Sequence, residues 1–149
     1  MAKHSTHPID DPVSCTGGNL RRATRAVNQV YDAALAPVGL KSTQFTLLAA
    51  LGHLGEVPLT RLAEALVLDR TTLTRNLKPL IEQGLIRSGG DEDRRVRRLG
   101  LTAKGKRRFE KALPHWRAAQ RGMVEKLGAE RWARLLDDLD ASVEAARQP

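Results

Sequence analysis

The sequence has few aromatic residues and a single cysteine, and both shortages restrict what the chain can be. Aromatic side chains make up 3% of its 149 residues, so leucine, alanine and valine must form most of the core. Cys15 has no second cysteine with which to form an intramolecular disulfide, so nothing argues for an oxidising compartment. No apolar run is long enough to cross a bilayer, and no basic-then-apolar leader opens the chain. We expect one cytoplasmic domain with no membrane association.

Motifs for catalysis and metal binding are also missing. The sequence contains no phosphate-binding loop, no nucleophile elbow and no HExxH motif, and its four histidines are dispersed without the spacing of metal ligands. We therefore expect neither an enzyme nor a metal or cofactor site.

Positive charge, in contrast, is concentrated in one block. Residues 69–108 contain 12 Lys/Arg against 5 Asp/Glu, whereas residues 1–68 contain 6 against 5 and residues 109–149 contain 7 of each. The net charge of +8 therefore arises almost entirely in this block. A basic patch attracts polyanions, and nucleic acid is the commonest of them. Because a merely solubilising surface would have the same charge, the order of the residues must decide.

Two short helical patterns meet at a tight break within residues 57–84. Ser42 is predicted to cap the apolar helix that precedes them, Thr60 the first of the two and Asp69 the second. Leu68 and Leu73 have the spacing of a hydrophobic staple around Asp69. Once its leucines are buried, the second helix exposes a polar face that contains Arg70, Thr71, Thr72, Thr74, Arg75 and Lys78. This arrangement predicts a helix-turn-helix whose second helix binds the major groove of DNA.

The side chains of this face have different expected roles. Arg75 is the best candidate to recognise a base, because its guanidinium can bind O6 and N7 of guanine together. Lys78 is expected to bind a phosphate. Arg70 is expected either to bind a phosphate or to pair with a neighbouring carboxylate.

A β-hairpin is predicted directly after the second helix. Residues 85–88 and 96–101 are predicted strands, separated by a turn rich in Gly, Asp and Glu. The outgoing limb contains Arg94, Arg95, Arg97 and Arg98. A basic hairpin at this position is typical of a wing that contacts phosphates and the minor groove, although a solvated strand face explains Arg97 and Arg98 equally well.

The predicted fold class is mainly α with a small β-hairpin wing. The winged helix-turn-helix covers residues 42–102, residues 1–17 form a flexible N-terminal arm, and residues 18–149 form a single domain. Helical patterns over residues 19–36 and 103–147, the latter divided into two helices and kinked at Pro114, have apolar faces that a monomer could not fully cover. We expect these N- and C-terminal helices to form a homodimer interface.

The order of these segments resembles the MarR family of bacterial regulators. Two helices are followed by TRLAEAL, then LDRTTLTRNLKPLIEQGLI, then a wing and a DxRxxxxxLT signature that falls on Asp93, Arg95, Leu101 and Thr102. The resemblance covers residues 19–147. It implies an intertwined homodimer that binds a pseudo-palindromic operator in double-stranded DNA. It also implies that Arg95 enters the minor groove and that Asp93 steadies it.

The resemblance implies a regulatory role as well, because most family members repress nearby genes and release DNA when a phenolic ligand binds or a cysteine is oxidised. We expect a sequence-specific repressor that a small aromatic or phenolic effector releases. Two alternatives are a non-specific architectural DNA-binding protein and a redox-sensing repressor that acts through Cys15. Redox sensing is disfavoured because Tyr31 is the chain's only tyrosine and the segment around Cys15 is expected to be loose.

Overall fold

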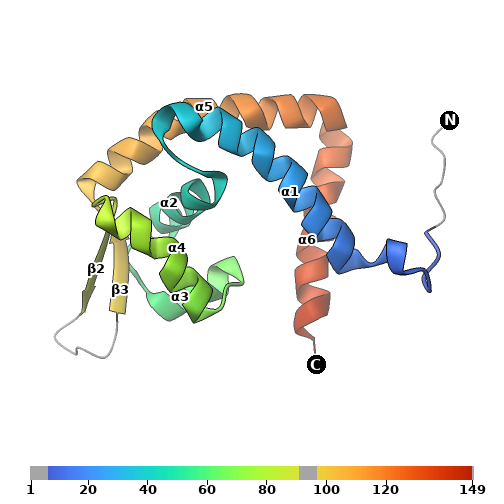
Figure 1. Ribbon diagram of the computed structural model, residues 1–149, viewed down its shortest axis with the longest axis horizontal. Helices are drawn as coiled ribbons and strands as arrows, with labels where there is room; N and C mark the ends of the chain where they lie inside the picture. Colours follow the sequence, from blue (N-terminus) through green and yellow to red (C-terminus); the bar gives the residue numbers. More distant parts are fainter. Residues whose placement is uncertain (1–6, 91–96, 149) are drawn as a thin grey trace.

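The computed structural model describes residues 7–90 and 97–148. Figure 1 shows two long helices, α1 (Thr16–Leu35) and α5 (Ala103–Leu127), crossing above a lobe that holds shorter helices and a small sheet. The last helix, α6 (Ala129–Arg147), descends from the end of α5 on the other side of the molecule from the hairpin. The remaining elements are η1 (Pro12–Ser14), η2 (Ala36–Val38), α2 (Ser42–Leu54), β1 (Val57–Pro58), α3 (Leu59–Leu66), α4 (Arg70–Glu82), β2 (Ile86–Gly90) and β3 (Arg97–Leu101).

Leucine supplies most of the buried side chains, as the shortage of aromatic residues predicts. The core lies where α2, α3, α4, the sheet and the first half of α5 meet. Phe45 of α2 contacts two aromatic rings of α5, with centroid distances of 5.2 Å to Phe109 and 5.6 Å to Trp116. These contacts fasten the lobe to the long helices above it.

The sheet confirms the predicted hairpin and adds one strand. Its order is β1–β3–β2 and all pairs are antiparallel, with Ile86 opposite Leu101 and Val57 opposite Leu99. The two-residue strand β1 was not predicted, because so short a segment has no periodicity and is extended only through its pairing with β3. The turn, residues 91–96, lies outside the described residues.

Two of the predicted helix caps are wrong. Ser42 is the first residue of α2 rather than its cap, and its N–H donates to Oδ1 of Asp32 at 2.6 Å, a partner that only the neighbouring α1 supplies. Thr60 lies inside α3, which begins at Leu59 because Pro58, with φ of −59°, leads directly from β1 into the helix. Asp69 is the cap of α4, as predicted, and Thr102 is the cap of α5.

The start of α1 also differs from the expectation. The helix begins at Thr16, inside the segment predicted as an arm, and Cys15 is its N-cap, with Sγ accepting the N–H of Gly18 at 3.5 Å. The side-chain amide of Asn19 donates to the carbonyl oxygens of Val13 and Cys15 at 2.9 and 3.0 Å. The expectation of a loose segment around Cys15 is therefore wrong, because these bonds attach it to the helix.

Within the described residues, no single helix is long and apolar enough to span a membrane. Residues Thr16–Val38 and Ser42–Leu54 reach that length and composition only as a pair, which is bent by 76°. The apolar composition of α2 is explained by its buried side chains Phe45, Leu47, Leu48 and Leu51.

Candidate nucleic-acid interface

The start of α4 is set by Asp69 and Thr72. Oδ1 of Asp69 accepts the N–H of Thr72 at 2.8 Å, and Oδ2 accepts its hydroxyl at 2.6 Å. These two bonds, the hydroxyl's first, hold the pKa of Asp69 below its usual value. Thr72 was predicted to contact DNA with the rest of its face, but its hydroxyl is engaged in this cap and its side chain is half-buried.

The two faces of α4 are sharply different. Leu73, Leu77 and Leu80 are fully buried in the core, which leaves the opposite side of the helix in solvent. Arg70 and Thr71, Thr74 and Arg75, and Lys78 occupy three successive turns of this exposed side. The helix therefore presents a continuous stripe of three cationic groups and two hydroxyls.

This stripe forms one wall of an open hollow of about 1080 Å³. The end of β1 and the start of α3 form a second wall, through Pro58, Leu59 and Thr60. Arg97 of β3 is also part of the lining. The hollow therefore brings together six of the predicted DNA-contacting residues, namely Arg70, Thr71, Thr74, Arg75, Lys78 and Arg97.

Positive charge dominates the hollow. Among the described residues that line it, Glu82 is the one acidic side chain, and its Oε1 lies 3.9 Å from Nζ of Lys78. Both side chains are well exposed, at 64% and 75%, so this pair is weak and leaves Lys78 able to bind another anion. A surface of this kind suits a polyanion that lies along α4 and reaches β3.

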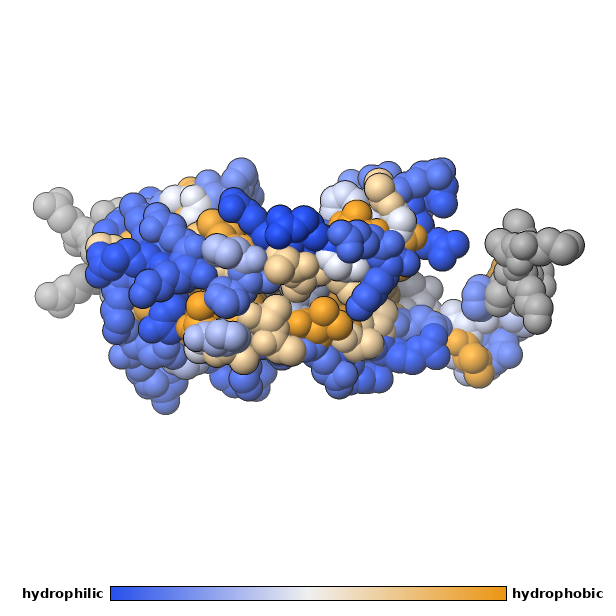
Figure 2. Space-filling model, turned by 90° about the horizontal axis from the view of Figure 1, so that it is seen from above, coloured by the Kyte–Doolittle hydropathy of each residue, from blue (hydrophilic) through white to orange (hydrophobic). Residues whose placement is uncertain are grey.

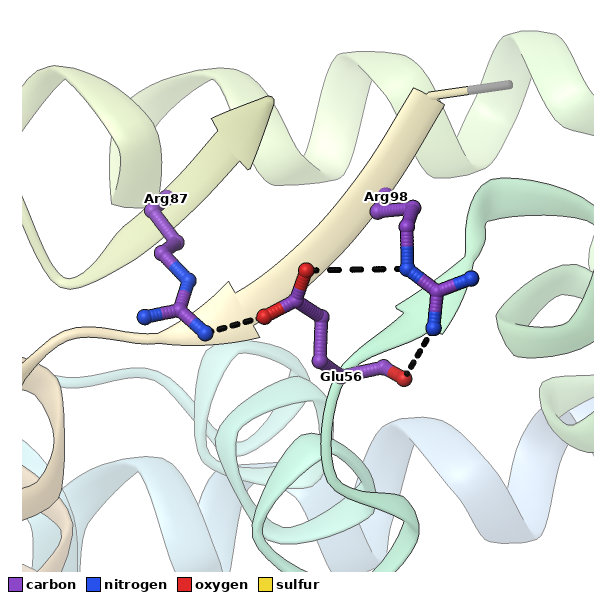
Figure 3. Close-up of polar contacts among 3 residues, drawn as sticks. All are labelled: Glu56, Arg87 and Arg98. Atoms are coloured by element: carbon purple, nitrogen blue, oxygen red, sulfur yellow. Dashed lines mark hydrogen bonds and ion pairs between the residues drawn. The ribbon is translucent and has the colours of Figure 1, made fainter. Parts of the chain in front are cut away.

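The sheet separates Arg97 from Arg98, which the sequence alone left equivalent. Consecutive residues of a strand point to opposite faces, so Arg97 faces the hollow while Arg98 faces away from it. Nε of Arg97 donates to Oγ of Ser88 on β2 at 2.6 Å. On the other face, Arg98 and Arg87 both contact Glu56 (Figure 3). Sequence reasoning missed Glu56, because its partners are 31 and 42 residues away.

The other predicted residues lie elsewhere or are not described. Asp93, Arg94 and Arg95 fall outside the described residues. Cys15 is exposed and does not line the hollow. Within residues 7–90 and 97–148, no group of three or more His, Cys, Asp or Glu side chains is arranged to hold a metal ion.

A second, smaller cavity lies between α1, α2 and α5. Its volume is about 210 Å³, and its lining is Val27, Asn28, Tyr31, Leu35, Ser42, Phe45, Thr46 and Trp116. The hydroxyl of Tyr31 donates to Oε1 of Gln120, and burial raises the pKa of this tyrosine. The buried hydroxyl of Ser42 has no hydrogen-bond partner among the described residues, which is costly unless something else satisfies it.

An exposed cationic recognition helix followed by a hairpin with an arginine beside it defines a winged helix-turn-helix protein. Residues 40–96 match the model of the MarR family. The chain is 38% identical to the M. tuberculosis transcriptional regulator MosR, solved in complex with DNA, with a TM-score of 0.78 over 90% of this chain and 99% of that one. The chain belongs to the MarR family of transcriptional regulators.

Two other relatives agree with this assignment. The transcriptional repressor CouR, solved bound to a 23-mer DNA duplex, is 26% identical, with a TM-score of 0.79 over 93% of this chain and 99% of that one. The HTH-type transcriptional regulator YdgJ of Bacillus subtilis, itself uncharacterised, is 28% identical over 117 residues, which cover 77% of this chain and 71% of that protein.

Proposed function

We propose that the chain is a sequence-specific DNA-binding repressor whose α4 binds in the major groove while the β2–β3 hairpin lies against the neighbouring backbone and minor groove. The observation that carries this proposal is the hollow that joins the polar face of α4 to Arg97 of β3. Its open shape and positive charge suit a duplex better than a small molecule, because its cations come from two separate elements, α4 and β3. MosR and CouR were both solved bound to DNA, which supports DNA binding by this fold.

The chemistry along α4 indicates how a site would be read. From Arg70 to Lys78 the helix rises about 12 Å, which corresponds to about three to four base-pair steps of 3.4 Å. Arg75 lies in the middle of this length, where its planar guanidinium can recognise guanine. Arg70 and Lys78 lie at the two ends, where phosphates are the nearer partners. We assign base recognition to Arg75 and Thr74, and positioning to Arg70 and Lys78.

We infer that the protein acts as a homodimer. Among its described residues α6 has none that is buried, and its apolar residues Leu135, Leu136 and Val143 are 41%, 42% and 38% exposed. Figure 2 shows further apolar side chains gathered in a band between hydrophilic margins on the side where α1 and α5 lie. A second copy of the chain would cover these faces and hold two α4 helices about one DNA turn apart on a pseudo-palindromic operator.

We further infer that a small aromatic effector releases the DNA by binding the 210 Å³ cavity. The stacked rings of Phe45 and Trp116 offer an aromatic wall, and the hydroxyl of Ser42 offers an unused polar group. The cavity borders both α1, on the proposed dimer side, and α2, which packs against α4. A ligand bound there would change the position of α2, and with it α4, relative to α1.

The repressor proposal is tested by selecting a preferred duplex from a random pool and measuring its affinity by fluorescence anisotropy against a scrambled duplex. Arg75→Ala should weaken binding to the selected duplex by about 1–3 kcal/mol and reduce its preference for one base. Arg134→Ala is the matched control, because Arg134 lies on α6, away from the hollow, and its partner among the described residues is Glu130 of its own helix, at 2.6 Å. Equal affinity of the native protein for both duplexes would favour the architectural alternative.

Arg95 remains a prediction from the family resemblance. Its replacement by Ala should weaken binding to both duplexes and lower the salt dependence of the affinity by about one ion.

The effector proposal is tested by titrating 4-hydroxybenzoate, a phenolic acid, against a Trp132→Phe variant in which Trp116 is the remaining tryptophan and can be excited selectively. We expect the probe to quench Trp116 and to lower the affinity for the selected duplex. Ser42→Ala should weaken this quenching while leaving DNA affinity without the probe unchanged. DNA release by the phenol without any change in Trp116 fluorescence would place the effector elsewhere.

A further inference from the structure

Glu56 occupies a junction between the helix-turn-helix and the hairpin. It follows Gly55, which ends α2, and it precedes β1, which runs directly into α3. The backbone before Glu56 is held because the N–H of Gly55 donates to the carbonyl oxygen of Leu51 at 2.9 Å, and the backbone after it leads through β1 into α3, whose Leu59 and Leu62 are buried in the core. Glu56 is therefore fixed to the body of the lobe.

Figure 3 shows the side chain of Glu56 lying between two arginines of the hairpin. One carboxylate oxygen pairs with Arg87 of β2, and the other lies 3.5 Å from Nε of Arg98 of β3. A guanidinium nitrogen of Arg98 also donates to the backbone carbonyl oxygen of Glu56, at 3.0 Å. One residue of the body therefore contacts both strands of the hairpin through three separate oxygens.

The base of the hairpin is held in the core by Ile86 of β2 and Leu99 of β3, which are buried, and the hairpin is also held by its pairing with β1. Strand β1 pairs with β3 over two residues, and one of them, Pro58, has no N–H to donate. Arg87 reaches Glu56 across the backbone of Gly100, where an added Cβ would lie 3.2 Å from Nε of the arginine. The side chain of Arg87 can thus reach Glu56 only because residue 100 is a glycine.

These contacts bear on the opposite face of the sheet. Arg97 and Arg98 are consecutive residues of β3 and so point to opposite faces. The contacts of Arg98 with Glu56 therefore also determine the position of Arg97, which lines the hollow on the side opposite α4. In addition, the carboxylate partly neutralises Arg87 and Arg98, so these two arginines attract phosphate less than Arg97 does.

We propose that Glu56 is a positioning residue for the wing: by holding Arg87 and Arg98 it fixes the hairpin relative to α4, and so determines how well the protein distinguishes its own site from other DNA. This inference rests on the proposed function. Loss of the carboxylate frees one or both guanidinium groups, which strengthens attraction to any duplex, and it loosens the hairpin, which weakens the fit to the preferred one. The first effect acts on both duplexes and cancels in the ratio of the affinity for the preferred duplex to the affinity for other DNA. The second effect lowers this ratio, so the ratio measures how well Glu56 holds the hairpin in place.

The test compares Glu56→Gln with Glu64→Gln. Both changes remove one negative charge from the same lobe, but among the described residues the carboxylate of Glu64 pairs within α3, with Arg61 at 3.8 Å. The probes are the duplex selected by the native protein and its scrambled counterpart. We expect Glu56→Gln to lower the ratio of affinities about fivefold, the upper strength of an exposed ion pair, and Glu64→Gln to leave the ratio unchanged.

A second pair of variants keeps every charge. Gly100→Ala should displace Arg87 from Glu56 and lower the ratio about twofold, again within the strength of an exposed ion pair. Gly89→Ala, in the same hairpin with nothing within 4 Å of the new Cβ, should leave the ratio unchanged. If Glu56→Gln does not fold, as judged by circular dichroism, this second pair decides.

The outcomes are distinct. Equal ratios for Glu56→Gln and Glu64→Gln, or for Gly100→Ala and Gly89→Ala where the first pair cannot be used, would overturn the role of Glu56 while the proposed function stands. A native protein that binds both duplexes equally would overturn the proposed function, and the role of Glu56 with it.

Discussion

Gly105, in the first turns of α5, permits a close approach between that helix and the helix-turn-helix lobe. It is buried, and a Cβ added there would overlap the carbonyl oxygen of Leu85 and lie 2.9 Å from its carbonyl carbon. Carbon atoms prefer separations of about 3.5–4.0 Å, so the two backbones would have to move apart by more than half an ångström. Leu85 directly precedes β2, so this movement would shift both the connection between α4 and β2 and the hairpin that follows it.

The cost can be worked from the contacts that such a movement disturbs. Overpacking of a tight site costs about 1–3 kcal/mol. The carbonyl oxygen of Leu85 also accepts a hydrogen bond from the N–H of Thr102 at 3.1 Å. Losing this hydrogen bond costs about 1 kcal/mol. Replacing glycine in a helix returns about 0.5–1 kcal/mol. Gly105→Ala should therefore lower the free energy of unfolding by about 1–3 kcal/mol.

Gly122→Ala is the control, because Gly122 lies in the same helix and nothing lies within 4 Å of its added Cβ. It should raise the free energy of unfolding by about 0.5–1 kcal/mol. Both are measured by urea denaturation followed by circular dichroism, at one protein concentration because the proposed dimerisation would contribute to stability. Equal shifts in the same direction would refute the close approach at Gly105.

Three further predictions concern other parts of the chain. Hydrogen bonds from Thr72 and Ser42 lower the pKa values of Asp69 and Asp32, respectively. The stability that these two carboxylates contribute is therefore complete above their ordinary pKa of 3.8 and is lost as the pH falls below that value. Urea midpoints measured between pH 7 and pH 3 check this. Leu136→Glu should convert the dimer to a species of 16.4 kDa in sedimentation, whereas an unchanged mass would contradict the proposed interface. Peroxide should affect DNA binding equally in the native protein and in Cys15→Ser, and a selective loss in the native protein would establish redox sensing.

Local chemistry made much of this protein predictable. The spacing of leucines locates α4 and its exposed face, and Asp69 and Thr102 cap their helices because their partners lie three residues away. The basic segment after α4 predicts the hairpin, since turn residues and alternation are also local signals. Where a residue interacts with a near neighbour in the chain, the interaction can be predicted directly from the sequence.

The remaining features depend on partners that are distant in the sequence. Ser42 follows Asp32 of another helix rather than acting as a cap, β1 exists because β3 lies beside it, and Gly105 matters because Leu85 faces it. Arg97 and Arg98 are chemically identical, and only the orientation of the sheet directs one to the hollow and the other to Glu56. Composition and spacing therefore determined which charges the protein has, whereas tertiary packing decided which of them are free to bind DNA, because pairing depends on distance in space.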